Sequence, residues 1–148
     1  MKSLIIFILL GLSLTYKPED AVSYARTHCA VYSKSYSDLS KEGGDSANFV
    51  SQCLKAGGLD LSNCGVKTDK HGSIHKSADL KSCLTKKGWH SSTSLPSGFK
   101  GGYPMFRTSN SHALIATIVS GTTVYYCSHT DDHCDAILGS GVTYFYPK

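Results

Sequence analysis

Apolar residues recur at helical spacing in the first half of the chain, and this pattern predicts three helices. The first opens at residues 16–20, where a proline and two acids suit the positive end of a helix dipole. The second lies between the glycine pairs of residues 43–58, and the third runs from Ser77, as its cap, to Gly88. The predicted buried faces are Val22, Ala25 and Cys29 in the first helix, Phe49, Val50, Cys53 and Leu54 in the second, and Leu80, Cys83 and Leu84 in the third.

The hydrophobic pattern changes to that of strands after residue 102. Loops are predicted where polar residues and glycine dominate, at 33–44, 59–75 and 89–102. Strands are predicted at 103–107, 112–119, 124–129 and 142–146, with a hairpin turn at 120–123. Helices followed by antiparallel strands indicate an α+β fold, with N-terminal helices packed on a small antiparallel sheet.

The start of the chain has the form of a secretory signal. A short basic start, Met1-Lys2-Ser3, precedes the apolar run Leu4–Leu14, which is too short to cross a bilayer. We therefore expect residues 1–15 to be a signal peptide and residues 16–148 to form a single secreted domain; a membrane anchor is the alternative. After cleavage we expect a monomer that does not associate with membranes.

An exported chain with an even number of cysteines favours disulfide bonds. Up to three are expected, and the spacing does not reveal the pairing. Cys53 lies on the apolar face of the second helix, so a buried thiol is the alternative there. The candidates are Cys29, Cys53, Cys64, Cys83, Cys127 and Cys134.

The net charge argues against a nucleic-acid partner. It is +4, falls to +3 without the segment that carries Lys2, and includes no long block of Lys and Arg. A mildly basic protein suits an anionic surface such as a bacterial wall, although ordinary solubility explains the same charge.

The first turn of the second helix is a candidate for nucleophilic chemistry. Ser46 stands there, next to backbone N–H groups that have no partner within the helix and that can stabilise an oxyanion. Asp45 has the residue type of a helix cap and is also a candidate for contact with a substrate. The glycines before it allow a substrate backbone to approach closely.

The predicted hairpin offers a base for such a nucleophile. If its turn is centred on Gly121-Thr122, facing residues have numbers that sum to about 243, so His112 faces Asp131 and His129 lies near the same end. One histidine can then act as base while a second polar group orients its ring, which is the logic of a nucleophile–His–polar triad.

The stretch "GGDSANFVSQCLKAGG" resembles the putative amidase domain family, a secreted branch of the NlpC-like, papain-like hydrolases. Its usual motif is G-G-D-C-T-N-F-V-S-Q followed by a stretch that ends in A-G-G. The resemblance extends to Tyr16 with the segment 21–25, to Ser111-His112 with Ile115, to 125–130 (YYCSHT) and to the closing TYFY of 143–146.

By this resemblance the fold is papain-like and the activity is hydrolysis of an amide bond in bacterial cell-wall peptidoglycan or its peptide fragments, without a cofactor. Position 46 carries the nucleophile, and the backbone N–H of Ser46 belongs to the oxyanion hole. His112 is then the general base and His129 the orienting third member, with Asp131 as the rival for that role. Which amide bond is cleaved stays open, as does whether the role is antibacterial, nutritional or in remodelling the producer's own wall.

The departure from the family is Ser46, where the family has cysteine. Ser46 is a working nucleophile, or the protein is an inactive relative that binds wall fragments, or the sequence is an engineered Cys-to-Ser form of an active enzyme. Loss of rate is the usual result of such a change, because a hydroxyl needs more help from a base than a thiol does.

Other polar and aromatic residues have weaker predictions. Asn48 and Gln52 support the site or form a solvated face, and Trp89 is partly buried or lines the substrate cleft, whose wall is predicted at 91–102. No metal is expected; zinc at His129 and His133, or at His71 and His75, is the weaker alternative because these stretches are not helical.

Overall fold

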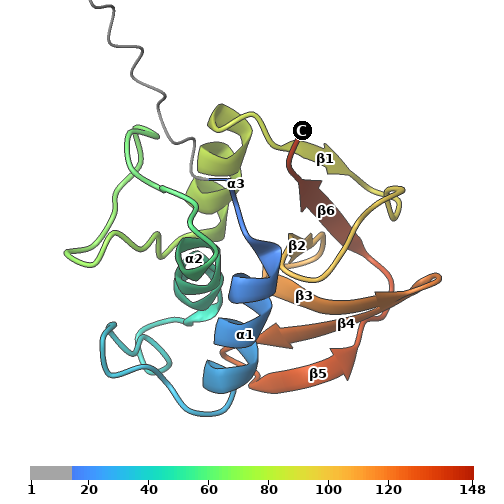
Figure 1. The fold of residues 1–148 in the computed structure, drawn as a ribbon. Helices are drawn as coiled ribbons and strands as arrows, with labels where there is room; N and C mark the ends of the chain where they lie inside the picture. Colours follow the sequence, from blue (N-terminus) through green and yellow to red (C-terminus); the bar gives the residue numbers. More distant parts are fainter. Residues whose placement is uncertain (1–14) are drawn as a thin grey trace, which may run out of the picture.

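The computed structural model describes residues 15–148, which form three helices followed by a six-stranded sheet (Figure 1). All of the strand pairs are antiparallel, in the order β1-β6-β2-β3-β4-β5. The α+β class is therefore confirmed. The elements are α1 (Pro18–His28), α2 (Ser46–Ala56), α3 (Ser77–Lys86), β1 (His90–Ser92), β2 (Pro104–Arg107), β3 (Ala113–Ser120), β4 (Thr123–Ser128), β5 (His133–Ile137) and β6 (Val142–Tyr146).

The signal peptide predicted at residues 1–15 lies outside the described residues, apart from Thr15. None of the helices formed by residues 15–148 has both the length and the apolar run needed to cross a bilayer.

Helix α2 is the centre of the molecule. It contacts α1, α3, β3 and β4, and every residue from Ala47 to Leu54 is buried. The buried faces of α1 are the small residues Ala21 and Ala25, one turn apart. The buried polar side chains of α2, Asn48, Ser51 and Gln52, each make a hydrogen bond within the protein, although Asn48 Oδ1 has no partner among the described residues.

Asn48 and Gln52 are two of these buried polar residues, so the prediction of a solvated face is wrong for both. The Asn48 amide donates to the Ser37 carbonyl oxygen, and Gln52 Oε1 accepts a hydrogen bond from the Tyr24 hydroxyl at 2.8 Å. Both side chains connect α2 to the segments around it.

Two edge strands and one cap differ from the sequence-based prediction. Strand β1 lies in the expected loop 89–102, and β5 was not predicted; both are short and largely exposed, so neither shows an alternating apolar pattern. Ser77 is the first helical residue of α3 rather than its cap, which is Lys76. The exact first residue of a helix depends on local backbone angles, which the identity of one or two residues does not specify.

The β3–β4 hairpin forms as predicted, but a bulge changes its register. Ser120 pairs with Thr123 and Ile118 with Tyr125, as the predicted sum of 243 requires. Beyond Thr117, Ala116 pairs with Tyr126, so the sum becomes 242. The pairs of β3 and β4 end at Ile115 and Cys127, so the predicted pairing of His112 with Asp131 lies beyond them.

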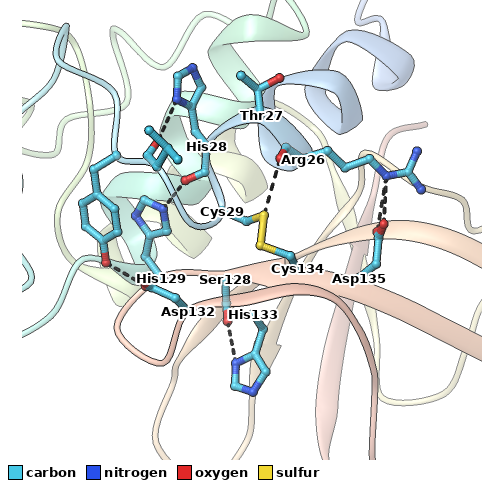
Figure 2. Close-up of a disulfide and its surroundings, with 12 residues drawn as sticks. Arg26, Thr27, His28, Cys29, Ser128, His129, Asp132, His133, Cys134 and Asp135 are labelled. Carbon is cyan, nitrogen blue, oxygen red and sulfur yellow. Dashed lines mark hydrogen bonds and ion pairs between the residues drawn. A yellow bond between two sulfur atoms is a disulfide. The ribbon is translucent and has the colours of Figure 1, made fainter.

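Two disulfide bonds form, rather than three. Cys29–Cys134 connects the end of α1 to β5 (Figure 2). Cys64–Cys83 connects the long loop before α3 to that helix. The other two cysteines, Cys53 and Cys127, are buried free thiols, and burial raises the pKa of each above its usual value. The buried-thiol alternative for Cys53 is thus the one that the structure adopts.

We expect the two disulfides to contribute unequally to stability. Their sequence separations are 105 and 19 residues, and in the chain-entropy description the longer loop stabilises more, by about 1.5 kcal/mol. The double variant Cys29→Ala/Cys134→Ala should therefore lose more free energy of unfolding than Cys64→Ala/Cys83→Ala. Urea unfolding of the two variants beside the parent measures this, and equal losses would contradict it.

Candidate active site

A cleft of about 380 Å³ lies over the start of α2, where the sequence predicted a nucleophile. Its walls come from three parts of the chain: the turn before α2 with the end of β4, the start of α3, and the turn before β3. The lining residues are Gly43, Gly44, Ser46 and Thr130; His75, Lys76, Ser77 and Ala78; and Asn110, Ser111 and His112.

Ser46 is the first residue of α2, and it lines this cleft. Its Oγ accepts a hydrogen bond from the backbone N–H of Ala113 at 3.3 Å, which favours negative charge on that oxygen. Within residues 15–148, the backbone N–H of Ser46 itself has no hydrogen-bond partner. It is therefore free to stabilise an oxyanion, as predicted for this position.

The glycine pair before α2 is required by its backbone. Gly43 and Gly44 have φ angles of +98° and +116°, which other residues rarely adopt. A Cβ on Gly44 would also lie 3.3 Å from Thr130 Oγ1. The pair thus lets the end of β4 approach the start of α2.

His112 lies at the other wall of the cleft, just before β3. Its position is held by the turn: its backbone N–H donates to Asn110 Oδ1, and the preceding Ser111 has a left-handed φ of 58°. Burial lowers the pKa of His112 below its ordinary 6.5, the positive charge of Arg107 lowers it further, and the negative charge of Asp131 opposes them. His112 is therefore neutral near pH 7, as a general base must be.

Ser46 and His112 line the same cleft without a direct hydrogen bond between their side chains. Catalytic hydrogen bonds are often long in the absence of substrate, so this arrangement is compatible with proton transfer once a substrate is bound.

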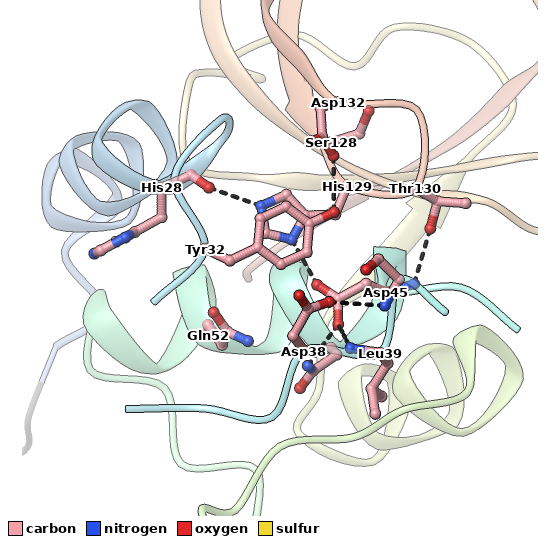
Figure 3. A network of polar contacts seen from close by, with 12 residues as sticks. His28, Tyr32, Asp38, Leu39, Asp45, Gln52, Ser128, His129, Thr130 and Asp132 are labelled. Carbon is pink, nitrogen blue, oxygen red and sulfur yellow. Dashed lines mark hydrogen bonds and ion pairs between the residues drawn. The ribbon is translucent and has the colours of Figure 1, made fainter. Parts of the chain in front are cut away.

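His129, the predicted third member, lies outside the cleft lining and makes other contacts (Figure 3). It is buried, its Nδ1 lies 2.5 Å from Asp45 Oδ2, and its Nε2 donates to the His28 carbonyl oxygen at 2.7 Å. Tyr32 and Phe49 stack on its two faces, with ring centroids 3.8 and 3.9 Å away. Both ring nitrogens of His129 thus contact Asp45 and His28 rather than His112.

Asp45 is buried with His129 and has several partners (Figure 3). Its Oδ1 accepts from the Leu39 backbone N–H at 3.0 Å and from the Asn48 amide at 2.8 Å, and its own N–H donates to Thr130 Oγ1 at 2.8 Å. Its side chain makes no capping hydrogen bond to α2, although the residue stands at the cap position. Asp45 is thus the cap residue of α2, as its residue type predicted, but without the side-chain bond that such a cap usually makes.

Trp89 and the loop at 91–102 do not line the cleft. Trp89 is buried in the core, where its ring meets those of Tyr16 and Tyr103 edge to face. The walls come instead from 75–78 and 110–112. The Asn-Ser-His run at 110–112 is the signal that could have indicated the second wall, because a turn must precede the strand there.

The residues considered for zinc are used otherwise. His75 Nε2 lies 2.7 Å from Asp69 Oδ2, and His133 Nδ1 contacts the Asp131 carbonyl oxygen. In the described part of the chain, residues 15–148, no group of three or more His, Cys, Asp or Glu side chains is arranged to hold a metal ion.

Comparison with known proteins gives one match. Residues 15–100 match the model of the putative amidase domain family, which is more than half of the chain. The matched region contains all three helices and Ser46 but ends before β2, so it does not reach His112. No curated protein and no solved structure matches the chain.

The surroundings of His112 predict its titration. Nuclear magnetic resonance of the imidazole ring should give a midpoint below pH 6.5, because burial and Arg107 disfavour the charged form. Arg107→Gln should raise the midpoint and Asp131→Asn should lower it. If the ring carries out base catalysis, the acidic limb of kcat/KM should move with the midpoint in both variants. A midpoint above 6.5, or the same shift in both variants, would contradict this account of the site.

Proposed function

Because this chain belongs to the putative amidase domain family, we propose that it is a secreted hydrolase that cleaves an amide bond in bacterial cell-wall peptide. The family supports amidase activity in general. The two disulfide bonds are consistent with an extracellular protein. The choice of substrate rests on the resemblance of the motif at residues 43–58 to NlpC-like, papain-like hydrolases.

The observation that carries the proposal is the meeting of Ser46 and His112 in one cleft, from the start of α2 and the start of β3. In the reaction, Ser46 Oγ attacks the amide carbonyl carbon while His112 takes the hydroxyl proton. His112 then returns that proton to the leaving amine, and water, activated by the same ring, releases the acid. The Ser46 N–H stabilises the oxyanion.

Asp131 takes the supporting role in this scheme, by its charge rather than by a hydrogen bond to the ring. Its negative charge raises the pKa of His112 and favours the imidazolium that forms during the reaction. His129 is the less suitable candidate, because both of its nitrogens are bonded to Asp45 and His28.

The charge of the cleft suits an acidic peptide. Among its lining residues Lys76 is the one with a full charge at neutral pH, and none is acidic. Stem peptides of bacterial walls carry free carboxylates, which a lysine beside the nucleophile attracts. The papain-like architecture is part of the same proposal, supported by a nucleophile-bearing helix that packs on an antiparallel sheet carrying the histidine.

A second candidate function is binding of wall fragments without turnover. The observation that favours it is the absence of a hydrogen bond between the Ser46 and His112 side chains within residues 15–148; the Ser46 oxygen is instead bonded to the Ala113 N–H. A serine in a cleft shaped for cysteine can retain affinity after its reactivity is lost.

The experiment that separates these functions uses residues 16–148 and purified peptidoglycan, with released fragments identified by mass spectrometry. We expect release by the parent, a loss of about 10³-fold or more in Ser46→Ala, and faster release by Ser46→Cys. Ser82→Ala, an exposed serine on α3, is the matched control and should behave like the parent.

Two other outcomes decide against hydrolysis by the parent. Release by Ser46→Cys alone, with co-sedimentation of the parent, would indicate a binding protein in an otherwise complete site. No release and no co-sedimentation by any variant would overturn the cell-wall substrate.

A further inference from the structure

We propose that Asp45 and His129 are positioning residues: the buried pair holds the Asp45 carboxylate away from the start of α2 and balances its charge, so that no unpaired negative charge lies beside Ser46. The proposal rests on the proposed function for the chemistry at Ser46. Its geometry stands independently of any substrate.

An aspartate at the cap position of a helix normally accepts a hydrogen bond from the N–H of the second or third helical residue. Asp45 occupies this position before α2 and makes no such bond. The cap residues of α1 and α3 are lysines, which have no side-chain acceptor. In residues 15–148, α2 is thus the one helix whose cap residue is able to bond its N–H groups and does not.

The carboxylate is instead fully occupied by groups outside the first-turn backbone of α2. Oδ2 lies 2.5 Å from His129 Nδ1, and Oδ1 accepts from the Leu39 N–H and the Asn48 amide. The Asp45 N–H is bonded to Thr130 Oγ1, so backbone and side chain are both held by the end of β4. Rotation toward α2 would break the bond to His129.

The protons of His129 follow from its partners. Nε2 faces the His28 carbonyl oxygen and must carry a hydrogen, and a second proton lies between Nδ1 and the Asp45 carboxylate. The pair therefore has no net charge. A carboxylate that capped α2 would place a full negative charge beside Ser46, which opposes an oxyanion or a thiolate there.

The ring is held firmly enough to act in this way. Tyr32 and Phe49 are nearly parallel to it, at 6° and 17°, and the Tyr32 hydroxyl donates to Asp132. Phe49 belongs to α2 itself and His28 to the last turn of α1. His129 is thereby held beside Asp45, between α2 and the last turn of α1 (Figure 3).

The test needs no substrate. In the Ser46→Cys protein, the rate of alkylation by iodoacetamide measures the thiolate at the start of α2 as a function of pH. Adding His129→Phe keeps an aromatic ring between Tyr32 and Phe49 but removes both donors. The freed Asp45 carboxylate should then disfavour the thiolate, lowering the rate at pH 7 about tenfold or more and moving the profile to higher pH.

The decisive variant adds Asp45→Asn to His129→Phe, because this removes the unpaired charge. We expect alkylation within about threefold of Ser46→Cys alone. Asp45→Asn with His129 intact should also keep that rate, since an amide can donate to the neutral ring and accept from Leu39 and Asn48. His90→Phe, at an exposed histidine on β1, is the matched control and should change nothing.

The outcomes separate positioning from simple damage to the fold. Two results would overturn the proposal. One is a triple variant that is alkylated as slowly as Ser46→Cys/His129→Phe. The other is a Ser46→Cys/His129→Phe protein that is alkylated as fast as Ser46→Cys alone. Near-ultraviolet circular dichroism shows whether each variant folds. If Ser46→Cys/His129→Phe does not fold, the alkylation rate of the triple variant Ser46→Cys/His129→Phe/Asp45→Asn decides, because that protein buries no unpaired charge. Inactivity on peptidoglycan would leave this result unchanged and would overturn only the proposed function.

Discussion

The contact between Asp45 and His129 is the interaction on which the arrangement of the candidate site depends. It joins the turn before α2 to the end of β4, and through the His28 carbonyl oxygen it reaches the last turn of α1. The two side chains are about 99% buried, so neither can exchange its partner for water. Removing one partner of such a pair leaves a buried charge, which typically costs about 3–5 kcal/mol. The geometry near Ser46 therefore cannot change without disturbing the core.

A second constraint comes from the hairpin. The bulge at Thr117 shifts the β3–β4 register by one residue, and the pairing runs as far as Ile115 and Cys127. Beyond these pairs, Thr130 bonds the backbone of Asp45 and lines the cleft together with His112. The two ends of one hairpin thus serve different tasks: the segment after β4 holds the helix, and the turn before β3 presents the histidine.

The sequence predicts the helices well, because their apolar spacing and glycine boundaries are local signals. The α2 prediction between the glycine pairs is an example, and the hairpin turn at Gly121-Thr122 is another. Strands β1 and β5 carry no such signal, since they are short and largely exposed. The motif of residues 43–58 indicated Ser46, and its position over a cleft agrees with that.

The partners of His129 could not be predicted in the same way. Its contacts join residues about 84 and 101 positions apart, and local pattern carries no information about such pairs. The one-residue bulge also lies beyond what a turn position can specify. The motifs that contain His129 and Asp45 suggested catalytic chemistry for both residues. Their burial instead keeps both side chains out of the cleft.

The state of His112 bears on whether a serine can act at this site. A cysteine enzyme relies on a thiolate beside an imidazolium, which a histidine of low pKa does not favour. A hydroxyl keeps its proton until the transition state and needs a neutral base within reach. Burial and the charge of Arg107 hold His112 in that neutral state, and the Ala113 N–H already bonds the Ser46 oxygen. These two features are compatible with a serine nucleophile, so the replacement at position 46 need not mean that the site is inactive.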